Sequence, residues 1–358
     1  MKVKLGDVCD RGSSNLKQSD VINQNGQYPV YGAAGLLGNI DLYHQDKPYV
    51  AVVKDGAGIG RVTLHPGYSS VIGTLQYLLP KENVLPEYLY YVTKHMHLEK
   101  YYTGATIPHI YFKDYKNEKF NLDAIEKQQR IVDILKKTEN IIESRQQELQ
   151  KLDDLIRARF VELFGDQTTN PYGWQQASIG ACCTLKSGTS LPADKENEGG
   201  AIPYVKVGDM NYPGNEQYIT TSSRFVSEQT AGTGVFPVGT VVFPKRGGAI
   251  GTNKKRLTRI PICADLNVMG VTASIRLTPQ YLMAYFNNID LGTLNNGSSV
   301  PQINNKDIAP LLICIPPMAL QEQFAAFVAA IDKSKATVQK ALDETQLLFD
   351  SLMQQYFG

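Results

Sequence analysis

The chain has 358 residues, of which 42% are hydrophobic and 20% charged, and its formal net charge at pH 7 is +1. This length and apolar content exclude a disordered chain and allow two or more domains, while the balanced charge gives by itself no reason to expect a nucleic-acid partner. Five cysteines without C-x-x-C spacing argue against a disulfide framework and a zinc site, and the lack of an apolar run of membrane-spanning length predicts a cytoplasmic protein with no membrane partner.

Residues 1–121 are predicted to form a mixed α+β domain. Strand-like runs, separated by Gly and Pro, lie at 49–53, 61–64 and 74–79. Residues 86–95 are typical of a helix with proline in its first turn. The glycine-rich stretch 56–60 favours a tight turn over a nucleotide-binding loop, because it lacks the complete dinucleotide fingerprint and a following helix pattern.

Residues 122–165 are predicted to form one long helix. No Gly or Pro occurs between 123 and 164. Apolar residues recur at the three- and four-residue steps of a heptad seam, at Leu135, Ile142, Leu149, Leu152, Ile156 and Leu163. Thr138, Arg145 and Arg159 occupy other seam positions, so the seam suits one specific partner better than a generic zipper.

Residues 166–318 are predicted to form a second mixed α+β domain of the same plan. Strand-like runs lie at 202–207, 239–243 and 271–277, and a helix with proline in its first turn at 279–286. A second glycine-rich stretch, 247–251, again favours a tight turn. Lysines and arginines without any acidic residue form a basic run over 245–259 that would attract phosphates, although a charge run alone is as often a solvated loop.

Residues 319–358 contain a second long helix, from about 320 to 356. Its seam consists of Ile331, Val338, Leu342, Phe349, Leu352 and Tyr356, and Lys335 and Thr345 interrupt it. Two helices of similar length with complementary seams are expected to pair with each other in antiparallel fashion. Each would be about 55 Å long and would act as a spacer between the two domains.

Internal repetition indicates that the chain holds two copies of one module. The segment 104–114 returns at 297–307 with Gly, Pro, Ile, Lys and Asp in the same places. Three further matches keep the same order: 54–60 with 245–251, 125–128 with 320–323, and 163–165 with 356–358. So long a period indicates whole domains rather than a solenoid, and two domains about a pseudo-twofold axis suit a bipartite target with a fixed gap.

Together these motifs have the pattern of a known family. The matching loop and helix positions are Gly104, Pro108, Gln128, Gly297, Pro301, Gln302 and Gln323, and a Gly-Trp-x-x-x-x-Ile-Gly segment at 173–180 opens the second domain. Over essentially its full length the chain resembles the DNA-specificity subunit of type I restriction-modification systems. His109, Tyr111 and Phe112 depart from the pattern that the second copy follows.

The resemblance implies two target-recognition domains, 1–121 and 166–318, that alternate with two helical conserved regions, 122–165 and 319–358. It implies no chemistry in this chain, whose partners would be double-stranded DNA, two methyltransferase (modification) subunits and two restriction (translocase-nuclease) subunits. S-adenosylmethionine and ATP would bind those subunits, while this chain would hold neither cofactor nor metal. The sequence agrees, because it has no N-P-P-[FY] or D-P-P-Y methylation motif and no phosphate-binding G-x-x-x-x-G-K-[ST] loop.

DNA contacts are expected from cationic and amide side chains near the glycine-rich stretches, since such groups bind phosphates and base edges. The candidates are Lys245, Arg246, Asn253, Lys254, Lys255, Arg256 and Arg259 in the second domain, and Lys54 and Arg61, with Lys17 and Asn15 as weaker ones, in the first. Two other classes stay open on the residues alone: a structural coiled-coil scaffold that does not bind DNA, and a degenerate adenine methyltransferase.

Overall fold

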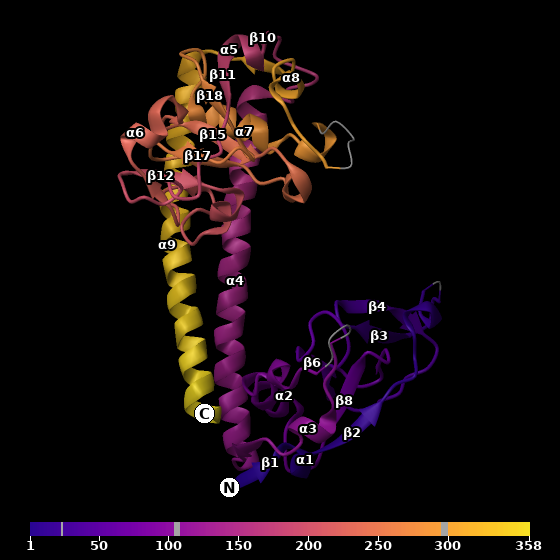
Figure 1. Cartoon of the computed structure of the whole chain (residues 1–358). Coiled ribbons are helices and arrows are strands. Elements are labelled where there is room, and N and C mark those ends of the chain that lie inside the picture. The colour runs from indigo at the N-terminus through magenta and orange to yellow at the C-terminus, as the bar shows by residue number, and fades with distance from the viewer. Residues whose placement is uncertain (23, 104–107, 295–299) are drawn as a thin grey trace. The chain divides into compact units, whose positions relative to one another are not determined.

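The computed structural model of the chain describes residues 1–22, 24–103, 108–294 and 300–358 (Figure 1). These residues form two compact units: the first comprises Met1–Gln147 and Val338–Gly358, and the second Glu148–Thr337. Two 40-residue helices belong to both units. Helix α4 (Ile125–Phe164) begins in the first unit and ends in the second, and α9 (Met318–Phe357) does the reverse. No helix among the described residues is long and apolar enough to cross a membrane.

The first unit is built on a four-stranded antiparallel sheet in the order β2-β8-β5-β6. These strands are β2 (Cys9–Ser13), β5 (Tyr49–Val53), β6 (Val62–His65) and β8 (Leu75–Pro80). A second sheet has the order β4-β3-β7, with β3 (Tyr28–Gly32), β4 (Gly35–Ile40) and β7 (Ser70–Val71), and β1 (Lys2–Lys4) pairs with β9 (Lys119–Asn121). The helices are α1 (Leu5–Val8), α2 (Pro86–His95) and α3 (Phe112–Tyr115).

The second unit has the same plan with one strand more in its main sheet, whose order is β11-β18-β15-β16-β13. These strands are β11 (Cys183–Ser187), β13 (Tyr218–Ile219), β15 (Thr240–Pro244), β16 (Arg256–Thr258) and β18 (Val268–Ala273). The second sheet is β14 (Phe225–Val226), β12 (Ile202–Val205) and β17 (Cys263–Ala264), and β10 (Gln175–Ser178) pairs with β19 (Leu312–Ile315). The helices are α5 (Ile179–Cys182), α6 (Glu228–Ala231), α7 (Pro279–Asn287) and α8 (Asn305–Ile308). The predicted α+β class and its helical linkers are confirmed.

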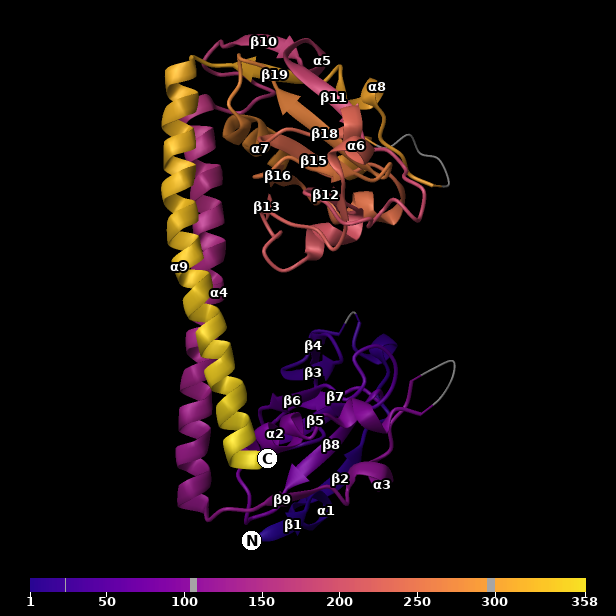
Figure 2. The ribbon, with the colours of Figure 1, turned by 60° about the vertical axis from the view of Figure 1, so that its left-hand side comes forward.

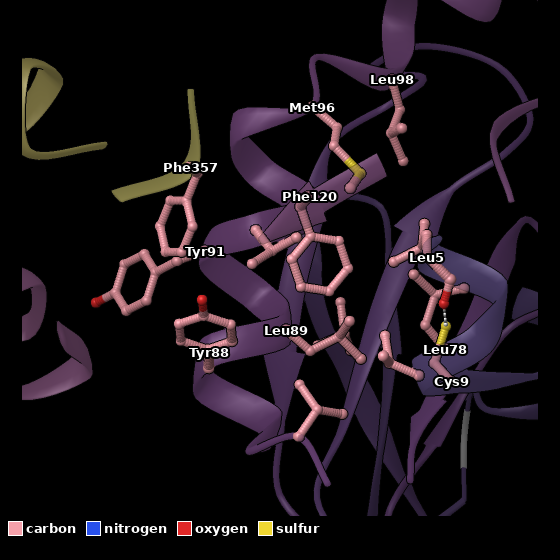
Figure 3. Close-up of a cluster of buried hydrophobic side chains, with 14 of the residues drawn as sticks. Leu5, Cys9, Leu78, Tyr88, Leu89, Tyr91, Met96, Leu98, Phe120 and Phe357 are labelled. Atoms are coloured by element: carbon pink, nitrogen blue, oxygen red, sulfur yellow. Dashed lines mark hydrogen bonds between the residues drawn. The ribbon is translucent and has the colours of Figure 1, made fainter. Parts of the chain in front are cut away.

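Strand β5 organises the core of the first unit, because all five of its residues are buried. Successive side chains of a strand point to opposite faces. Val50 and Val52 accordingly join the cluster under α2, shown in part in Figure 3, whereas Ala51 and Val53 join the cluster on the other face. An apolar run without alternation therefore marks a central strand covered on both sides.

Hydrogen bonds that tie the ends of each unit together recur in both copies. The first unit has Leu5 N–H to Glu118 O (2.8 Å), Gly6 N–H to Lys116 O (2.9 Å) and Tyr88 Oη to Asn121 O (3.0 Å). The second unit has Ile179 N–H to Leu311 O (2.8 Å), Gly180 N–H to Ala309 O (3.0 Å) and Tyr281 Oη to Cys314 O (2.9 Å). The duplication seen in sequence is thus a duplication of structure.

Helices α4 and α9 run antiparallel (Figure 2), and in each unit apolar side chains of both helices pack in one cluster. In the first unit, Leu135 of α4 packs in one cluster with Phe349 of α9. The polar seam positions also meet, since Arg145 of α4 donates hydrogen bonds to the Thr345 hydroxyl and the Ala341 carbonyl of α9. The predicted antiparallel pairing is therefore confirmed, and two of the residues that interrupt the seams, Arg145 and Thr345, meet in it.

The glutamine of the second helix opening is Gln321 rather than the predicted Gln323. Gln128 is fully buried in the first unit, where it binds the main chain in front of α2, and Gln321 is fully buried with the corresponding bonds in the second unit. Gln323 is exposed. Aligning 320–323 with 125–128 by residue type placed the glutamine equivalent to Gln128 two residues too late. The equivalent glutamine is the one on the buried face of the helix, which residue type alone does not indicate.

Candidate nucleic-acid interface

In the first unit, the glycine-rich turn after β5 lies against the loop that contains Pro108. Gly56 N–H donates to the Pro108 carbonyl (3.1 Å), and Ile110 N–H donates to the Lys54 carbonyl (3.0 Å). We call this contact between 54–56 and 108–110 the first crossing. Between these bonds Asp55 pairs with His109 through an isolated β-bridge, and their side chains meet through a carboxylate oxygen and Nδ1.

The second unit repeats the contact in the second crossing, between 245–247 and 301–303. Gly247 N–H donates to the Pro301 carbonyl (2.8 Å), and Ile303 N–H donates to the Lys245 carbonyl (2.9 Å). Here Arg246 pairs with Gln302 through the β-bridge, and Arg246 Nη2 lies 3.4 Å from Gln302 Oε1. Both predicted loop prolines therefore contribute a carbonyl to a crossing, while Gly104 and Gly297 lie outside the described residues.

The two glycine-rich stretches continue differently beyond the crossings. In the first unit Gly56, Gly58 and Gly60 all have φ values of +81 to +83°, as expected of glycines in tight turns. In the second unit only Gly247 of its stretch has a positive φ (+72°), and Gly247–Thr252 forms a 3₁₀ helix. The tight turn predicted for the second copy is therefore wrong after Gly247, because the main chain there forms a 3₁₀ helix instead.

Within the basic run, Lys255 lies inside the second unit, with 5% of its surface exposed. Its Nζ donates to Asn253 Oδ1 (2.7 Å) and to the Ile289 carbonyl (2.6 Å). Burial lowers the pKa of this ammonium to about 8. Asn253 Oδ1 also accepts from Leu291 N–H (2.9 Å). These contacts favour a structural role for both side chains.

Arg256 and Arg259 also bind within the unit. The Arg256 guanidinium donates to main-chain carbonyls, those of Asn215 (2.5 Å), Lys255 (2.8 Å) and Met210 (3.1 Å). Arg259 is exposed, but its guanidinium lies 3.8 Å from the centre of the Tyr218 ring and 3.5 Å from Asp332 Oδ2 of α9. Its partners therefore hold the guanidinium beside Tyr218 and α9.

Of the remaining predicted cations, Lys54, Lys245 and Arg246 belong to the crossings, and Arg61 and Lys254 follow the glycine-rich stretches along the chain. Arg246 is exposed, Lys254 is half-buried with its Nζ at the Asn211 side chain, and Lys245 Nζ donates to Ser187 Oγ (2.9 Å). In the first unit, Arg61 is exposed and donates one bond to the Ala33 carbonyl (2.9 Å), while Lys54 Nζ lies 3.7 Å from Asp55 Oδ2. The weaker candidates Asn15 and Lys17 are exposed as well.

Asp55 was missed among the candidates, because only cations and amides were considered. Aligning 54–60 with 245–251 places Asp55 opposite Arg246, so the signal was present in the repeat. His109 and Tyr111 also belong to this site, with ring centres 4.0 Å apart. Within the described ranges no group of His, Cys, Asp and Glu could hold a metal ion.

Comparison with known proteins gives consistent matches. The family model of the type I restriction modification DNA specificity domain matches residues 1–154 and 171–345. The type I restriction enzyme MjaIX specificity subunit of Methanocaldococcus jannaschii is 22% identical over 333 residues, which are 85% of this chain and 73% of that protein.

Two solved structures share the fold. The S subunit of a type I restriction-modification system from M. genitalium is 16% identical, with a TM-score of 0.62 over 100% of this chain and 96% of the other. A chain from a structure of type I system assembly and conformational transition is 17% identical, with a TM-score of 0.56 over 99% and 96%. The chain therefore belongs to the family of type I restriction-modification specificity subunits, the non-catalytic DNA-recognition components of these complexes.

Proposed function

We propose that this specificity subunit reads a bipartite DNA target, with one half-site bound by each crossing and its surroundings. The observation that carries the proposal is the duplication of the crossing itself, in which the same two main-chain hydrogen bonds hold different side chains. A duplicated reader with divergent side chains suits two unlike half-sites. The two unbroken helices α4 and α9, which connect the units, would fix the gap between these half-sites.

In this proposal, cations beside the crossings bind DNA phosphates and set the register of the protein on the duplex. Lys54 and Arg61 would do so in the first unit, and Lys245 and Lys254 in the second. Arg246 would also contact the DNA. Asn253, Lys255 and Arg256 would hold this surface in place through their hydrogen bonds within the unit.

The other subunits of the complex are proposed to be two methyltransferase and two restriction subunits, in the cytoplasm, where S-adenosylmethionine and ATP bind to those subunits and not to this chain. Apolar side chains exposed on the long helices support docking there. They include Ile134 (42% exposed), Ile141 (46%), Leu347 (67%) and Leu348 (53%). Ile134 and Ile141 lie two helical turns apart on the same face of α4, which suits a surface that a partner covers.

The experiment is to bind the complex of this chain with its methyltransferase subunits to a library of random duplexes and to sequence the bound DNA. Two short conserved half-sites separated by a gap of constant length are expected. The same motif should carry the methylated adenines in the host genome. A single contiguous motif, or enrichment equal to that of methyltransferase subunits alone, would contradict the proposal.

A further inference from the structure

The two crossings share their main-chain bonds but present opposite charge. Asp55 in the first unit stands where Arg246 stands in the second, and His109 stands where Gln302 stands. Three of the other differences between 104–114 and 297–307 are mild (Ala/Ser, Thr/Ser and Ile/Val), whereas Tyr111 and Phe112 stand opposite asparagines. A reversal of charge at equivalent positions of a duplicated scaffold indicates that the two copies meet different chemical groups there.

The described residues leave space at each crossing. Among them, no atom would lie within 4 Å of a Cβ added at Gly56 or Gly247, so the positive φ and not crowding favours glycine at these positions. The side chains of Asp55 and His109 are 28% and 24% exposed, and Arg246 is exposed. Main chain without side chains above it lets a base edge approach closely.

The second crossing offers a fork of donors held in place. Arg246 Nη2 faces Gln302 Oε1 at 3.4 Å, and Gln302 Nε2 donates to Asn304 Oδ1 (2.8 Å). Gln302 therefore lies beside the guanidinium and is the candidate positioning residue for it. A planar pair of N–H donors matches the O6 and N7 acceptors of guanine in the major groove.

The first crossing offers acceptors instead. One carboxylate oxygen of Asp55 meets His109 Nδ1, and the other lies 3.7 Å from Lys54 Nζ. The imidazole is held from its other side by the ring of Tyr111 at 4.0 Å. A carboxylate accepts hydrogen bonds from an exocyclic amino group, which cytosine and adenine present in the major groove and guanine and thymine do not.

We propose that the two crossings are the equivalent base-reading positions of the subunit: Arg246 selects guanine in one half-site, and Asp55 selects a base with a major-groove amino group in the other. The proposal rests on the bipartite DNA reading proposed above. It adds which side chains discriminate bases and what each one prefers.

The test compares base preferences of assembled complexes that carry Arg246→Lys, Asp55→Asn or Arg259→Gln, using a duplex library with both half-sites randomised. Arg246→Lys keeps the charge and removes the fork, so guanine preference at one position should fall by about five- to a hundredfold. Asp55→Asn supplies donors beside its acceptor and should relax or change one position in the other half-site. Arg259→Gln should leave every preference unchanged.

A transplant gives a second measurement. The double variant Asp55→Arg/His109→Gln should introduce guanine at the position that Asp55→Asn affects, with the opposite half-site unchanged. The inference is overturned if the variants bind DNA with wild-type preferences, or if both alter the same half-site. A wild-type complex without any bipartite preference would instead refute the proposed function.

Discussion

Gln128 and Gln321 make the same three hydrogen bonds in the two units. Each side-chain oxygen accepts from the residue before a helix, Leu85 N–H before α2 or Thr278 N–H before α7, at 2.9 Å in both cases. Each side-chain nitrogen donates to two main-chain carbonyls. One buried amide per unit thus fixes the start of a long helix to the globular part.

Replacing Gln128 or Gln321 by Ala should destabilise the unit that contains it. Removing a buried amide leaves main-chain groups without partners, which costs about 2–4 kcal/mol. Chemical unfolding followed by circular dichroism measures the effect. Gln323→Ala is the matched control, because this exposed glutamine should change stability by less than about 0.5 kcal/mol. Equal effects of Gln321→Ala and Gln323→Ala would contradict the assignment.

Salt dependence of DNA binding should separate the predicted cations by their position. Lys254→Gln and Arg61→Gln should weaken binding and lower the slope of log affinity against log salt by about 0.9 for each phosphate that the variant no longer neutralises. Arg259→Gln removes the same charge from the same run, but its guanidinium faces Tyr218 and α9. Its slope should match the wild type, and an equal decrease for Arg259→Gln would show that the whole run binds DNA.

Lys255 should make stability depend on pH in a defined direction. Its pKa is about 8 in the folded chain and about 10.4 in the unfolded chain. Between these values the unfolded chain holds a proton that the folded chain has released, so stability rises with pH. The unfolding free energy of wild type minus that of Lys255→Met should therefore grow by about 2.5 kcal/mol from pH 8 to pH 10.4. A constant difference would mean that water reaches the ammonium.

The sequence predicted the elements well wherever a local pattern decides the structure. Residues 49–53 and 86–95 have the predicted bounds as β5 and α2, because an unbroken apolar run and a proline-led amphipathic segment depend on near neighbours. The start of β18 was placed three residues late, at 271 instead of Val268, because its extra residues pair with distant β15. Strand ends set by partners far along the chain leave little trace in a local pattern.

The site was harder to predict than the fold, because a run of charges does not tell which way each side chain points. Lys254 and Lys255 are neighbours, yet Lys254 reaches the surface at Asn211 and Lys255 is buried against Ile289. Asp55 was recognisable only by its place in the repeat. Comparing the two copies position by position therefore identifies the site better than counting cations.

Removing one partner of the polar contact between Arg145 and Thr345 should destabilise the helix pair, whereas replacing both partners by apolar residues should not. Thr345→Val leaves the partly buried guanidinium with the Ala341 carbonyl alone, which should cost about 1–3 kcal/mol. Replacing both residues by Leu should restore wild-type stability or exceed it, because apolar pairs avoid the desolvation of a charge. Thermal unfolding of the two variants measures this, with the exposed Arg157→Ala on α4 as control. A double variant less stable than Thr345→Val would show that the guanidinium itself is required in the seam.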